Sequence, residues 1–353
     1  MQFAFFTHLP WPENTDPTQI IQEATLQVQY AETLGFKSAW LAEHHFTRYS
    51  MGSSSLILAT HLASSTRTIR LGTAVLVSPL HNPIRLAEDT ATLDLISGGR
   101  IDVGFGRGSS GYEYHGFNIN ADDSQERFQD SVRIIRGLWT TPEFSYNSRH
   151  YQVNQGNLVP MPIQDPHPPI YIAATRTAAT LDFAISEGHQ LCIAVVQDTS
   201  DALDLCKRYV NQSKESGRTV SIGDIPFFRY IYVAETEEQA YNDTHDHLNW
   251  VIDIMQWRRN IDTGSEVHRQ IVDWRTSRTE LPESYDYLAT NRAIIGTPEQ
   301  CLEKIRALRQ EGIQYFGCNF DFGGISHSKV CLLYTSDAAD DTPCVDLGGR
   351  RII

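Results

Sequence analysis

Long apolar runs and basic residues are both scarce in this sequence, and each scarcity excludes a class of partner. No apolar stretch approaches the ~20 residues that a membrane-spanning helix requires, so we expect no membrane association. The 29 Lys and Arg residues are outnumbered by 43 Asp and Glu residues, which gives a net charge of −14. Because nucleic-acid-binding proteins present Lys and Arg to the phosphate backbone, we expect no nucleic acid as a partner. An anionic ligand would have to bind at a locally positive site.

Cysteine pairs are also lacking, which bears on metal binding and on the cellular compartment. Six cysteines occur, and none forms a Cys-x-x-Cys pair, so neither a zinc site nor a disulfide framework is indicated. His245 and His247 lie two residues apart on a predicted helix and diverge, so they are not a metal-binding pair. The segment Met1–Pro10 has no basic stretch and does not resemble a signal peptide. We expect a cytoplasmic protein without a metal ion.

What the sequence does have is an alternation of short β-rich runs with longer amphipathic stretches. Hydrophobic residues make up 41% of the chain and charged residues 20%, close to the average for globular proteins. Successive β-α units predict parallel strands covered by helices. The predicted strands are Phe3–Thr7, Lys37–Ala42, Ile69–Leu76, Ile101–Phe105, Ile170–Ala174, Gln190–Val195, Phe227–Val233 and Ile313–Phe320. The predicted helices are Pro17–Leu34, Ser53–Ser64, Pro83–Ile96, Ser124–Leu138, Thr177–Glu187, Ser200–Ser216, Glu237–Arg258 and Thr297–Arg309.

This alternation fits an α/β protein built as one (β/α)8 TIM barrel over residues 1–330, with insertions after strand 4 and before strand 8. A doubly wound open sheet is the alternative, because pattern alone does not count strands. Phe144–Pro162 predicts a hairpin-like excursion after the fourth unit. Residues 260–289 are charged and lack a clear period, so they form either a functional lid or a disordered surface loop.

Two adjacent histidines, His44 and His45, directly follow the second predicted strand. In a barrel this is the face where active sites form. Adjacent residues in extended backbone point to opposite sides, so only one of the two can face the barrel mouth. A single inward histidine suits general acid–base chemistry, because its pKa lies near neutral pH. A histidine held by a neighbouring carboxylate is the structural alternative, and spacing alone favours it.

A glycine-rich loop follows the fourth predicted strand and contains a literal Gly-x-Gly-x-x-Gly pattern from Gly106 to Gly111. The dinucleotide-binding fingerprint requires a helix to open within such a loop, and residues 112–117 do not resemble a helix start. We therefore interpret the pattern as a chance match. Arg107 among these glycines instead predicts a phosphate clamp, because glycine lets the backbone approach a ligand and a guanidinium binds phosphate through two hydrogen bonds.

A second candidate anion site follows the fifth predicted strand, where Thr175, Arg176 and Thr177 precede a helix. Hydroxyls, a guanidinium and the free N–H groups of a helix start all attract anions. An ordinary helix cap with a surface arginine is the alternative for this segment alone. Two such segments after neighbouring strands are more informative than either one singly.

Motifs spread along the chain resemble those of a known family, that of bacterial luciferase and the luciferase-like monooxygenases. They follow the family's order and spacing from the first residues to about Val330. The matching stretches are Ala42–Thr47, Leu71–Val75, Asn82–Asp89, Ser97–Arg100, Gly106–Gly108 and Gly296–Glu299. The fold that the resemblance implies is the same barrel.

The resemblance implies a flavin-dependent monooxygenase in which reduced FMN (FMNH2) binds at the C-terminal mouth of the barrel. FMNH2 would react with O2 to give a C4a-peroxyflavin that oxygenates a small apolar organic substrate, and a separate flavin reductase would supply the FMNH2. By resemblance, His44 is the catalytic histidine and Arg107 binds the phosphate, together with the segment Thr175–Thr177. Ala74 and Val75 correspond to the strand end that carries a non-proline cis peptide bond beneath the flavin ring.

The sequence departs from the light-emitting members of that family at the site. Threonine and arginine in the segment Thr175–Thr177 stand where the light-emitting subunit has glutamate and serine, and Gly106 replaces its reactive cysteine. These departures put light emission and a long-chain aldehyde substrate in doubt. One alternative is a deazaflavin (F420)-dependent oxidoreductase, which transfers hydride. Another is a non-catalytic flavin-binding or partner subunit, against which an inward His44 argues.

The predicted helices Ser53–Ser64 and Pro83–Ile96 are the expected homodimer interface, because the family pairs its barrels there. Small residues would let another helix approach closely. They are Ser53, Ser54, Ser55, Ala59, Ala63 and Ser64. Packing of these small residues against the barrel itself is the alternative.

The last 23 residues, 331–353, depart from the family pattern. After Leu333 the apolar positions lose helical spacing, and Pro343, Gly348 and Gly349 disfavour a long helix. The stretch resembles translated sequencing-adapter read-through, so we interpret it as a non-native tail. A genuine divergent tail is the alternative.

Overall fold

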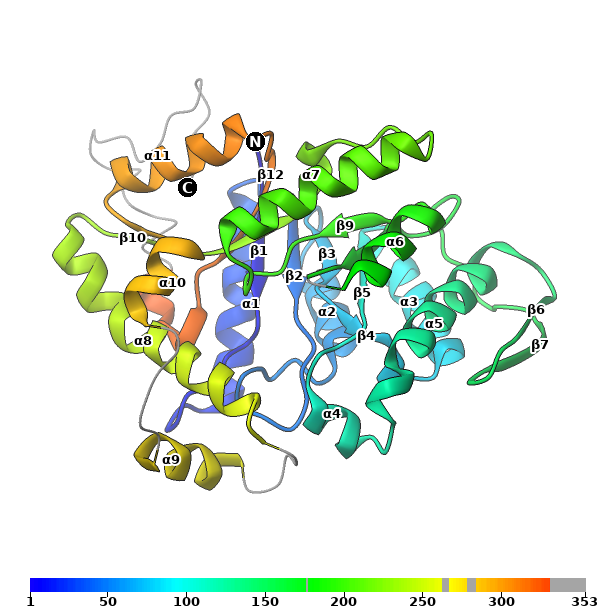
Figure 1. The fold of residues 1–353 in the computed structure, drawn as a ribbon, viewed down its shortest axis with the longest axis horizontal. Helices are drawn as coiled ribbons and strands as arrows, with labels where there is room; N and C mark the ends of the chain where they lie inside the picture. The colour runs from blue at the N-terminus through cyan, green and yellow to red at the C-terminus, as the bar shows by residue number, and fades with distance from the viewer. Residues whose placement is uncertain (176, 262–266, 278–283, 331–353) are drawn as a thin grey trace.

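Parallel strands curl around a common axis in the computed structural model, which describes residues 1–175, 177–261, 267–277 and 284–330 (Figure 1). The strands run in the order β11-β10-β12-β1-β2-β3-β5-β8-β9. A parallel bridge between Ile193 and Phe227 joins the region after β9 to β10, so the sheet closes on itself. The closed strands are β1 (Gln2–Thr7), β2 (Ser38–Leu41), β3 (Arg70–Thr73), β5 (Ile101–Gly106), β8 (Ile170–Ala173), β9 (Gln190–Cys192), β10 (Phe227–Val233) and β12 (Tyr315–Asn319). The predicted α/β barrel class is confirmed.

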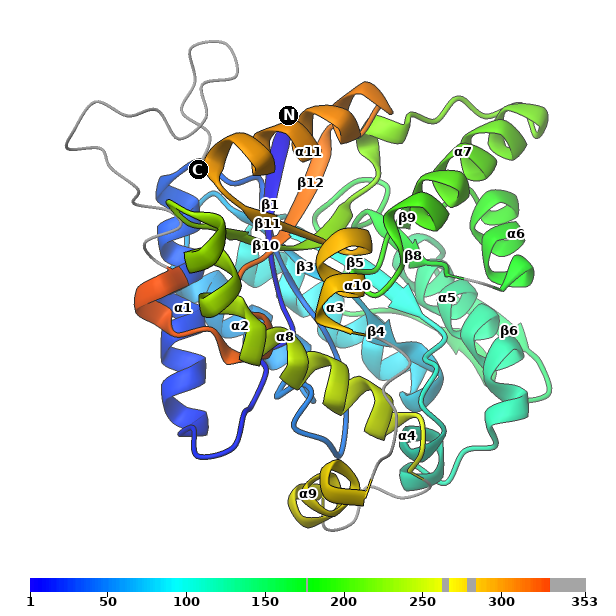
Figure 2. The ribbon, with the colours of Figure 1, turned by 60° about the vertical axis from the view of Figure 1, so that its left-hand side comes forward.

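Helices cover the outside of this barrel, as Figure 2 shows from a second direction. They are α1 (Pro17–Thr33), α2 (Ser55–Ser65), α3 (Pro83–Ser97), α5 (Ser124–Thr140), α6 (Ala178–Glu187), α7 (Thr199–Glu215), α8 (Glu237–Arg258) and α11 (Pro298–Gln310). Local chemistry fixes several helix starts: Asp16 and Asn82 cap α1 and α3, each followed by a proline, and Thr297 forms a capping box with Gln300. None of the described helices is both long and apolar enough to cross a bilayer.

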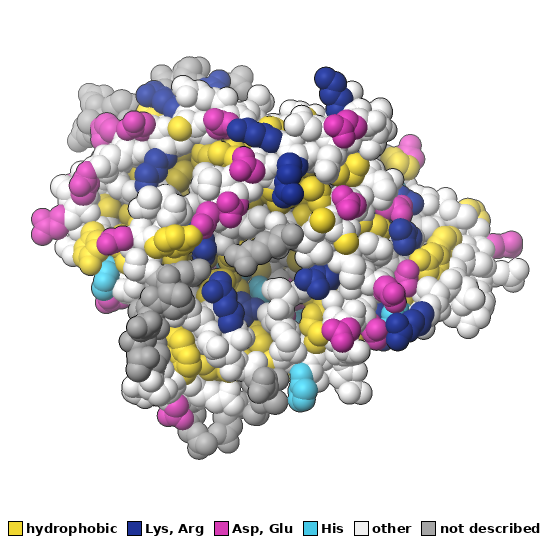
Figure 3. All heavy atoms as spheres, in the orientation of Figure 1, with side chains coloured by type: hydrophobic (Ala, Val, Ile, Leu, Met, Phe, Trp, Pro, Cys, Tyr) yellow, Lys and Arg dark blue, Asp and Glu magenta, His cyan; other side chains and the backbone are white. Residues whose placement is uncertain are grey.

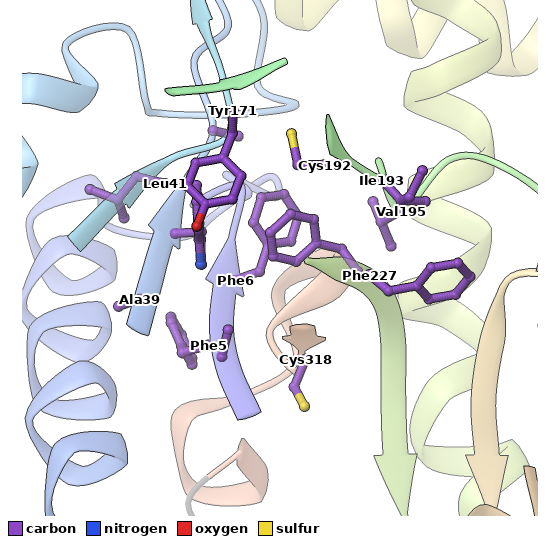
Figure 4. Packing of buried hydrophobic residues seen from close by; sticks show 14 of the residues in the cluster. Phe5, Phe6, Ala39, Leu41, Tyr171, Cys192, Ile193, Val195, Phe227 and Cys318 are labelled. Atoms are coloured by element: carbon purple, nitrogen blue, oxygen red, sulfur yellow. The ribbon is translucent and has the colours of Figure 1, made fainter. Parts of the chain in front are cut away.

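Large and small side chains alternate inside the barrel. Trp40 packs edge-on against Tyr171 with ring centroids 5.0 Å apart and also contacts Phe228. Gly72 and Gly317 leave the space that these rings fill, since a β-carbon there would lie 2.2 Å and 2.0 Å from Trp40 and Phe228. This interdigitation makes the barrel interior a packed core below the mouth. Figure 4 shows buried side chains contributed by different strands of the barrel, including Phe6, Tyr171 and Phe227.

At the barrel mouth, the structure differs from the sequence prediction in two elements. The single strand expected over Ile69–Leu76 is interrupted, with β3 ending at Thr73 and a separate β4 (Leu76–Val77) pairing with β5. The peptide bond between Ala74 and Val75 in the gap is cis, which an apolar pattern cannot reveal. The second difference is a short helix, α4 (Gly111–Gly116), where the sequence predicted none. Glycines at both ends of this helix weaken the helical pattern in the sequence, and burial of Tyr112 and Glu113 stabilises it.

The two insertions also have their own structure. A hairpin of β6 (Phe144–Asn147) and β7 (Gln152–Gly156) confirms the excursion after the fourth unit. The segment predicted to be irregular contains α9 (Val267–Ser277) and α10 (Tyr285–Asn291), and the missed strand β11 (Ala293–Gly296) follows it. The eight predicted strands already filled a (β/α)8 barrel, and β11 pairs with β10 outside that ring. Arg176 and the proposed non-native tail 331–353 lie outside the described residues.

Candidate active site

A cavity of about 220 Å³ lies at the C-terminal ends of the barrel strands. This is the face on which barrel enzymes carry their active sites. Its lining brings together seven of the eight residues that the sequence singled out, from four different strand ends: His44, Ala74, Val75, Gly106, Arg107, Thr175 and Thr177. The eighth, Arg176, lies outside the described residues. Figure 3 shows basic side chains near the centre of one face of this acidic molecule.

One end of the cavity offers hydrogen-bond donors and positive charge. Within the described residues, the side chain of Arg107 makes a single hydrogen bond, from Nη1 to Ser124 Oγ at 3.3 Å, so its other donors have no partner there. Thr177 is the N-cap residue of α6, and its hydroxyl makes no capping bond. Thr175 and Thr180 line the same end. A guanidinium, hydroxyls and a helix start together form an anion site.

The floor of the cavity depends on a close approach between two strand ends. A β-carbon on Gly106 would lie 2.4 Å from Val75 Cγ2, and one on Gly108 would lie 2.6 Å from Val77 Cγ1. Gly108 also has a φ of +80°, a conformation that favours glycine. The glycines at the end of β5 therefore have a structural reason, which is to let the chain on both sides of Arg107 pack closely against Val75 and Val77.

His44 faces the cavity and His45 does not, as the alternation argument predicted. His44 Nδ1 lies 3.1 Å from Glu113 Oε1 and 3.0 Å from Arg258 Nη2. Glu113 Oε1 also accepts the backbone N–H of His45 at 3.0 Å. No described residue bonds Nε2 of His44, so this nitrogen is left for a ligand.

Buried charge around His44 sets its protonation. Burial alone would raise the pKa of Glu113, but His44, Arg258 and the His45 N–H lower it to about 2. Burial and the Arg258 cation lower the pKa of His44, with Glu113 acting in the opposite direction. At neutral pH the site therefore holds an ionised Glu113, a cationic Arg258 and a neutral imidazole.

His45 belongs to a second group, with Glu43 and His81, of which Glu43 also lines the cavity. Glu43 Oε1 accepts from His45 Nε2 at 3.0 Å and from His81 Nε2 at 2.8 Å. Burial opposes ionisation of Glu43, but the two histidines lower its pKa. Among the described residues, these three are the only group that could ligate a metal ion by proximity. Their mutual hydrogen bonds account for the arrangement, in which both histidines hold one buried carboxylate.

Several cavity residues were missed by sequence reasoning. Glu113 lies on the overlooked helix α4, and Arg258 is the last residue of α8, 214 positions from His44. No local pattern marks either residue, because only the closed barrel brings them to the histidine. An apolar wall was missed as well, formed by Phe6, Tyr49, Val195, Val196, Phe228 and Met255. It would suit an apolar substrate or ring system.

Comparison with known protein sequences gives a family. Residues 1–315 match the sequence model of the luciferase-like monooxygenases. The oxygenase component of the flavin-dependent trigonelline monooxygenase from Acinetobacter baylyi is 24% identical over 329 residues, covering 92% of this chain and 90% of that protein. The alkanal monooxygenase alpha chain of the Kryptophanaron alfredi symbiont is 24% identical over 335 residues, covering 92% and 93%.

Solved structures share the fold over nearly the whole chain. Monooxygenase RslO1 from Streptomyces bottropensis has a TM-score of 0.78 at 23% identity, covering 94% of this chain and 95% of that one. The oxygenating constituent of 3,6-diketocamphane monooxygenase from Pseudomonas putida, solved with FMN, has a TM-score of 0.76 at 16% identity and covers 95% and 97%. A coenzyme F420-dependent reductase from Methanopyrus kandleri scores 0.69 at 18% identity, covering 95% and 97%.

Proposed function

The chain belongs to the luciferase-like monooxygenase family, and from this premise we propose that it is an FMNH2- and O2-dependent monooxygenase acting on a small apolar organic substrate. The observation that carries the proposal is that one cavity is lined both by Arg107, with its guanidinium donors, and by His44, whose Nε2 has no hydrogen-bond partner among the described residues. Two relatives support the choice of flavin: one is named a flavin-dependent monooxygenase and another was solved with FMN.

The residues present fit a flavin mononucleotide. Arg107, Thr175 and Thr177 would hold its phosphate, because they offer a cation and hydroxyls beside the N-terminus of α6. The cis peptide at Ala74–Val75 and the apolar wall would border its ring system. When bound in reduced form, the flavin supplies the electrons that activate O2. The protein would supply the pocket, its electrostatics and the exclusion of water.

His44 is the group of this chain that would act at the reacting atoms. Its Nε2 has no partner among the described residues, and Nδ1 is fixed by Glu113 and Arg258. A positioned imidazole can hold or move a proton at Nε2. The apolar wall, including Phe228 and Met255, would orient a substrate that lacks charge.

We further propose a separate flavin reductase as the source of FMNH2, and a homodimer of this chain. The first proposal follows from the relative described as an oxygenase component. The second follows from the apolar residues that α2 and α3 expose, Ile57 and Ile96. Three of the residues that the sequence offered for the interface, Ser55, Ala59 and Ala63, are buried within this chain. The small-residue argument for a dimer is therefore wrong for these three positions.

The test is to mix the purified protein with reduced FMN without oxygen, add O2 and record the flavin absorbance over milliseconds to minutes. A monooxygenase should bind reduced FMN and delay its oxidation through a transient species distinct from both oxidised and reduced flavin. Oxidation at the rate of free FMN would favour a non-catalytic flavin-binding subunit. Binding of F420 in preference to FMN would favour the hydride-transferring alternative.

A further inference from the structure

Arg258 and Glu113 both lie within hydrogen-bond distance of Nδ1 of His44, but they require opposite protonation of that nitrogen. A guanidinium can only donate hydrogen bonds, and an ionised carboxylate can only accept them. Arg258 Nη2, at 3.0 Å, needs Nδ1 of His44 to be without a proton, whereas Glu113 Oε1, at 3.1 Å, needs Nδ1 to carry one. A neutral imidazole has one ring proton. Which of the two neighbours hydrogen-bonds Nδ1 therefore decides which ring nitrogen of His44 carries the proton.

The donors and acceptors around Arg258 favour the arrangement in which Nδ1 of His44 carries no proton and accepts a hydrogen bond from Arg258. One proton of its Nη2 goes to Ser110 Oγ at 2.9 Å, and Nε–H goes to Tyr112 Oη at 2.7 Å. The second Nη2 proton has Nδ1 of His44 as its acceptor within hydrogen-bond distance, because Glu113 Oε1 lies 3.7 Å from Nη2. With a proton on Nδ1, an N–H would face an N–H at 3.0 Å in a buried site, which is costly.

Glu113 loses little in this arrangement, since it has other donors. Its Oε1 still accepts the His45 backbone N–H at 3.0 Å and the Tyr112 hydroxyl at 3.3 Å. Tyr112 can accept from Arg258 and donate to Glu113 at the same time. With Nδ1 of His44 as an acceptor, every hydrogen bond in the cluster is consistent except the one between Nδ1 and Glu113 Oε1, which is not made.

We propose that Arg258 is a positioning residue that fixes neutral His44 as the tautomer with its proton on Nε2, so that the histidine presents a hydrogen-bond donor to the cavity. This inference rests on the proposed function and narrows it. His44 stabilises negative charge on a reacting oxygen instead of removing a proton. A neutral imidazole used in this way is an established catalytic device, and a fixed donor in a dry site needs no rearrangement during the reaction.

The surroundings of His44 support a neutral ring. The titratable and charged groups that face it are His8 after β1, Glu43 and Tyr49 after β2, Tyr112 and Glu113 on α4, and Arg258 on α8. Arg258 is nearly buried and lies 4.1 Å above the ring of Tyr49, which fixes the guanidinium in place. Burial and Arg258 lower the pKa of His44, and burial lowers that of His8 as well.

The test determines directly which ring nitrogen of His44 carries the proton. Protein labelled with ¹⁵N in its histidine rings is examined by NMR near pH 7 without flavin, and His44→Gln identifies the His44 signals. The wild-type ring should show a protonated Nε2 and a bare Nδ1. A protonated Nδ1 in the wild type would overturn the proposal. Because no cofactor or turnover is involved, this outcome is independent of whether FMN and O2 are the true reactants.

The variant Arg258→Met, measured by the same experiment, provides a second test. Removing the cation should move the His44 proton to Nδ1, where Glu113 can accept it, and should shift the pKa of His44 upward. Arg259→Met removes the same charge at the adjacent exposed position and should leave both quantities unchanged. An unaltered tautomer and pKa in Arg258→Met would contradict the proposal. If that variant fails to fold, the wild-type spectrum still decides the question.

Discussion

The indole of Trp40 occupies the space that a side chain on Gly72 would need, since a β-carbon there would lie 2.2 Å from Trp40 Cδ2. Both residues lie on adjacent strands, paired in register Trp40 to Gly72. Trp40 is fully buried and donates its indole N–H to Ser38 Oγ at 2.7 Å. The ring therefore cannot swing away without losing packing and a hydrogen bond together.

Gly72→Ala should therefore destabilise the fold, by about 1–3 kcal/mol as is typical of overpacked cores. The measurement is the free energy of unfolding from denaturant titration. Gly111→Ala is the matched control, because nothing lies within 4 Å of a β-carbon at that position. Equal stability of the Gly72 variant and the wild type would show that the barrel interior accommodates a β-carbon at this position more easily than these distances imply.

Arg107→Ala should weaken FMN binding well over tenfold. A charge-assisted contact to phosphate is worth about 2 kcal/mol or more when partly buried. Arg107 is half-buried, and among the described residues its side chain donates a hydrogen bond only to Ser124. Fluorescence titration with FMN measures the change. Arg85→Ala is the control, since Arg85 pairs with Glu88 on the exposed surface of α3. Unchanged FMN affinity in the Arg107 variant would remove the phosphate assignment.

The sequence predicted the residues at the proposed phosphate-binding end of the cavity better than those that surround His44. Gly106 ends a strand, and Arg107 and the segment around Thr175 each follow one, so the barrel topology alone brings them to one mouth. Glu113 and Arg258 come from helices, where a side chain's direction depends on packing that no local pattern records. For the same reason, the strand and helix order could be predicted, whereas the break at Ala74–Val75 and the short helix α4 could not.

His44→Ala should reduce turnover by roughly 10²–10⁴-fold while FMN still binds, because it would remove the polar group that we propose acts at the reacting atoms. His45→Ala should act differently, through the buried pair with Glu43. It should lower the free energy of unfolding, since an ionised carboxylate would lose one of its two histidine donors. Equal losses of turnover in two equally stable variants would mean that the opposite facing of the two histidines is irrelevant to catalysis.

Glu113 should make the fold acid-sensitive. Its pKa is lowered from 4.5 to about 2 in the folded protein, so its contribution to stability is complete above the unfolded value and is lost as the pH falls from 4.5 toward 2. The full contribution is about 3 kcal/mol. Glu113→Gln should therefore flatten the decline of unfolding free energy below pH 4.5. Glu88→Gln, at an exposed surface pair, should leave that decline as it is. A slope unchanged by Glu113→Gln would contradict the assignment of a charged Glu113.

Ile57→Asp should dissociate the proposed homodimer. Ile57 is 71% exposed on α2, and Ile96 on the adjacent α3 is 51% exposed, so the two helices present apolar surface that a second copy could cover. In a two-fold dimer one substitution places two charges in the interface, which should convert the protein to monomers in sedimentation at micromolar concentration. Leu26→Asp is the control, because Leu26 is 53% exposed on α1 and lies outside this pair of helices. Circular dichroism should show the same helix content in both variants. A wild-type protein that sediments as a monomer, or a dimer lost equally in both variants, would count against this interface.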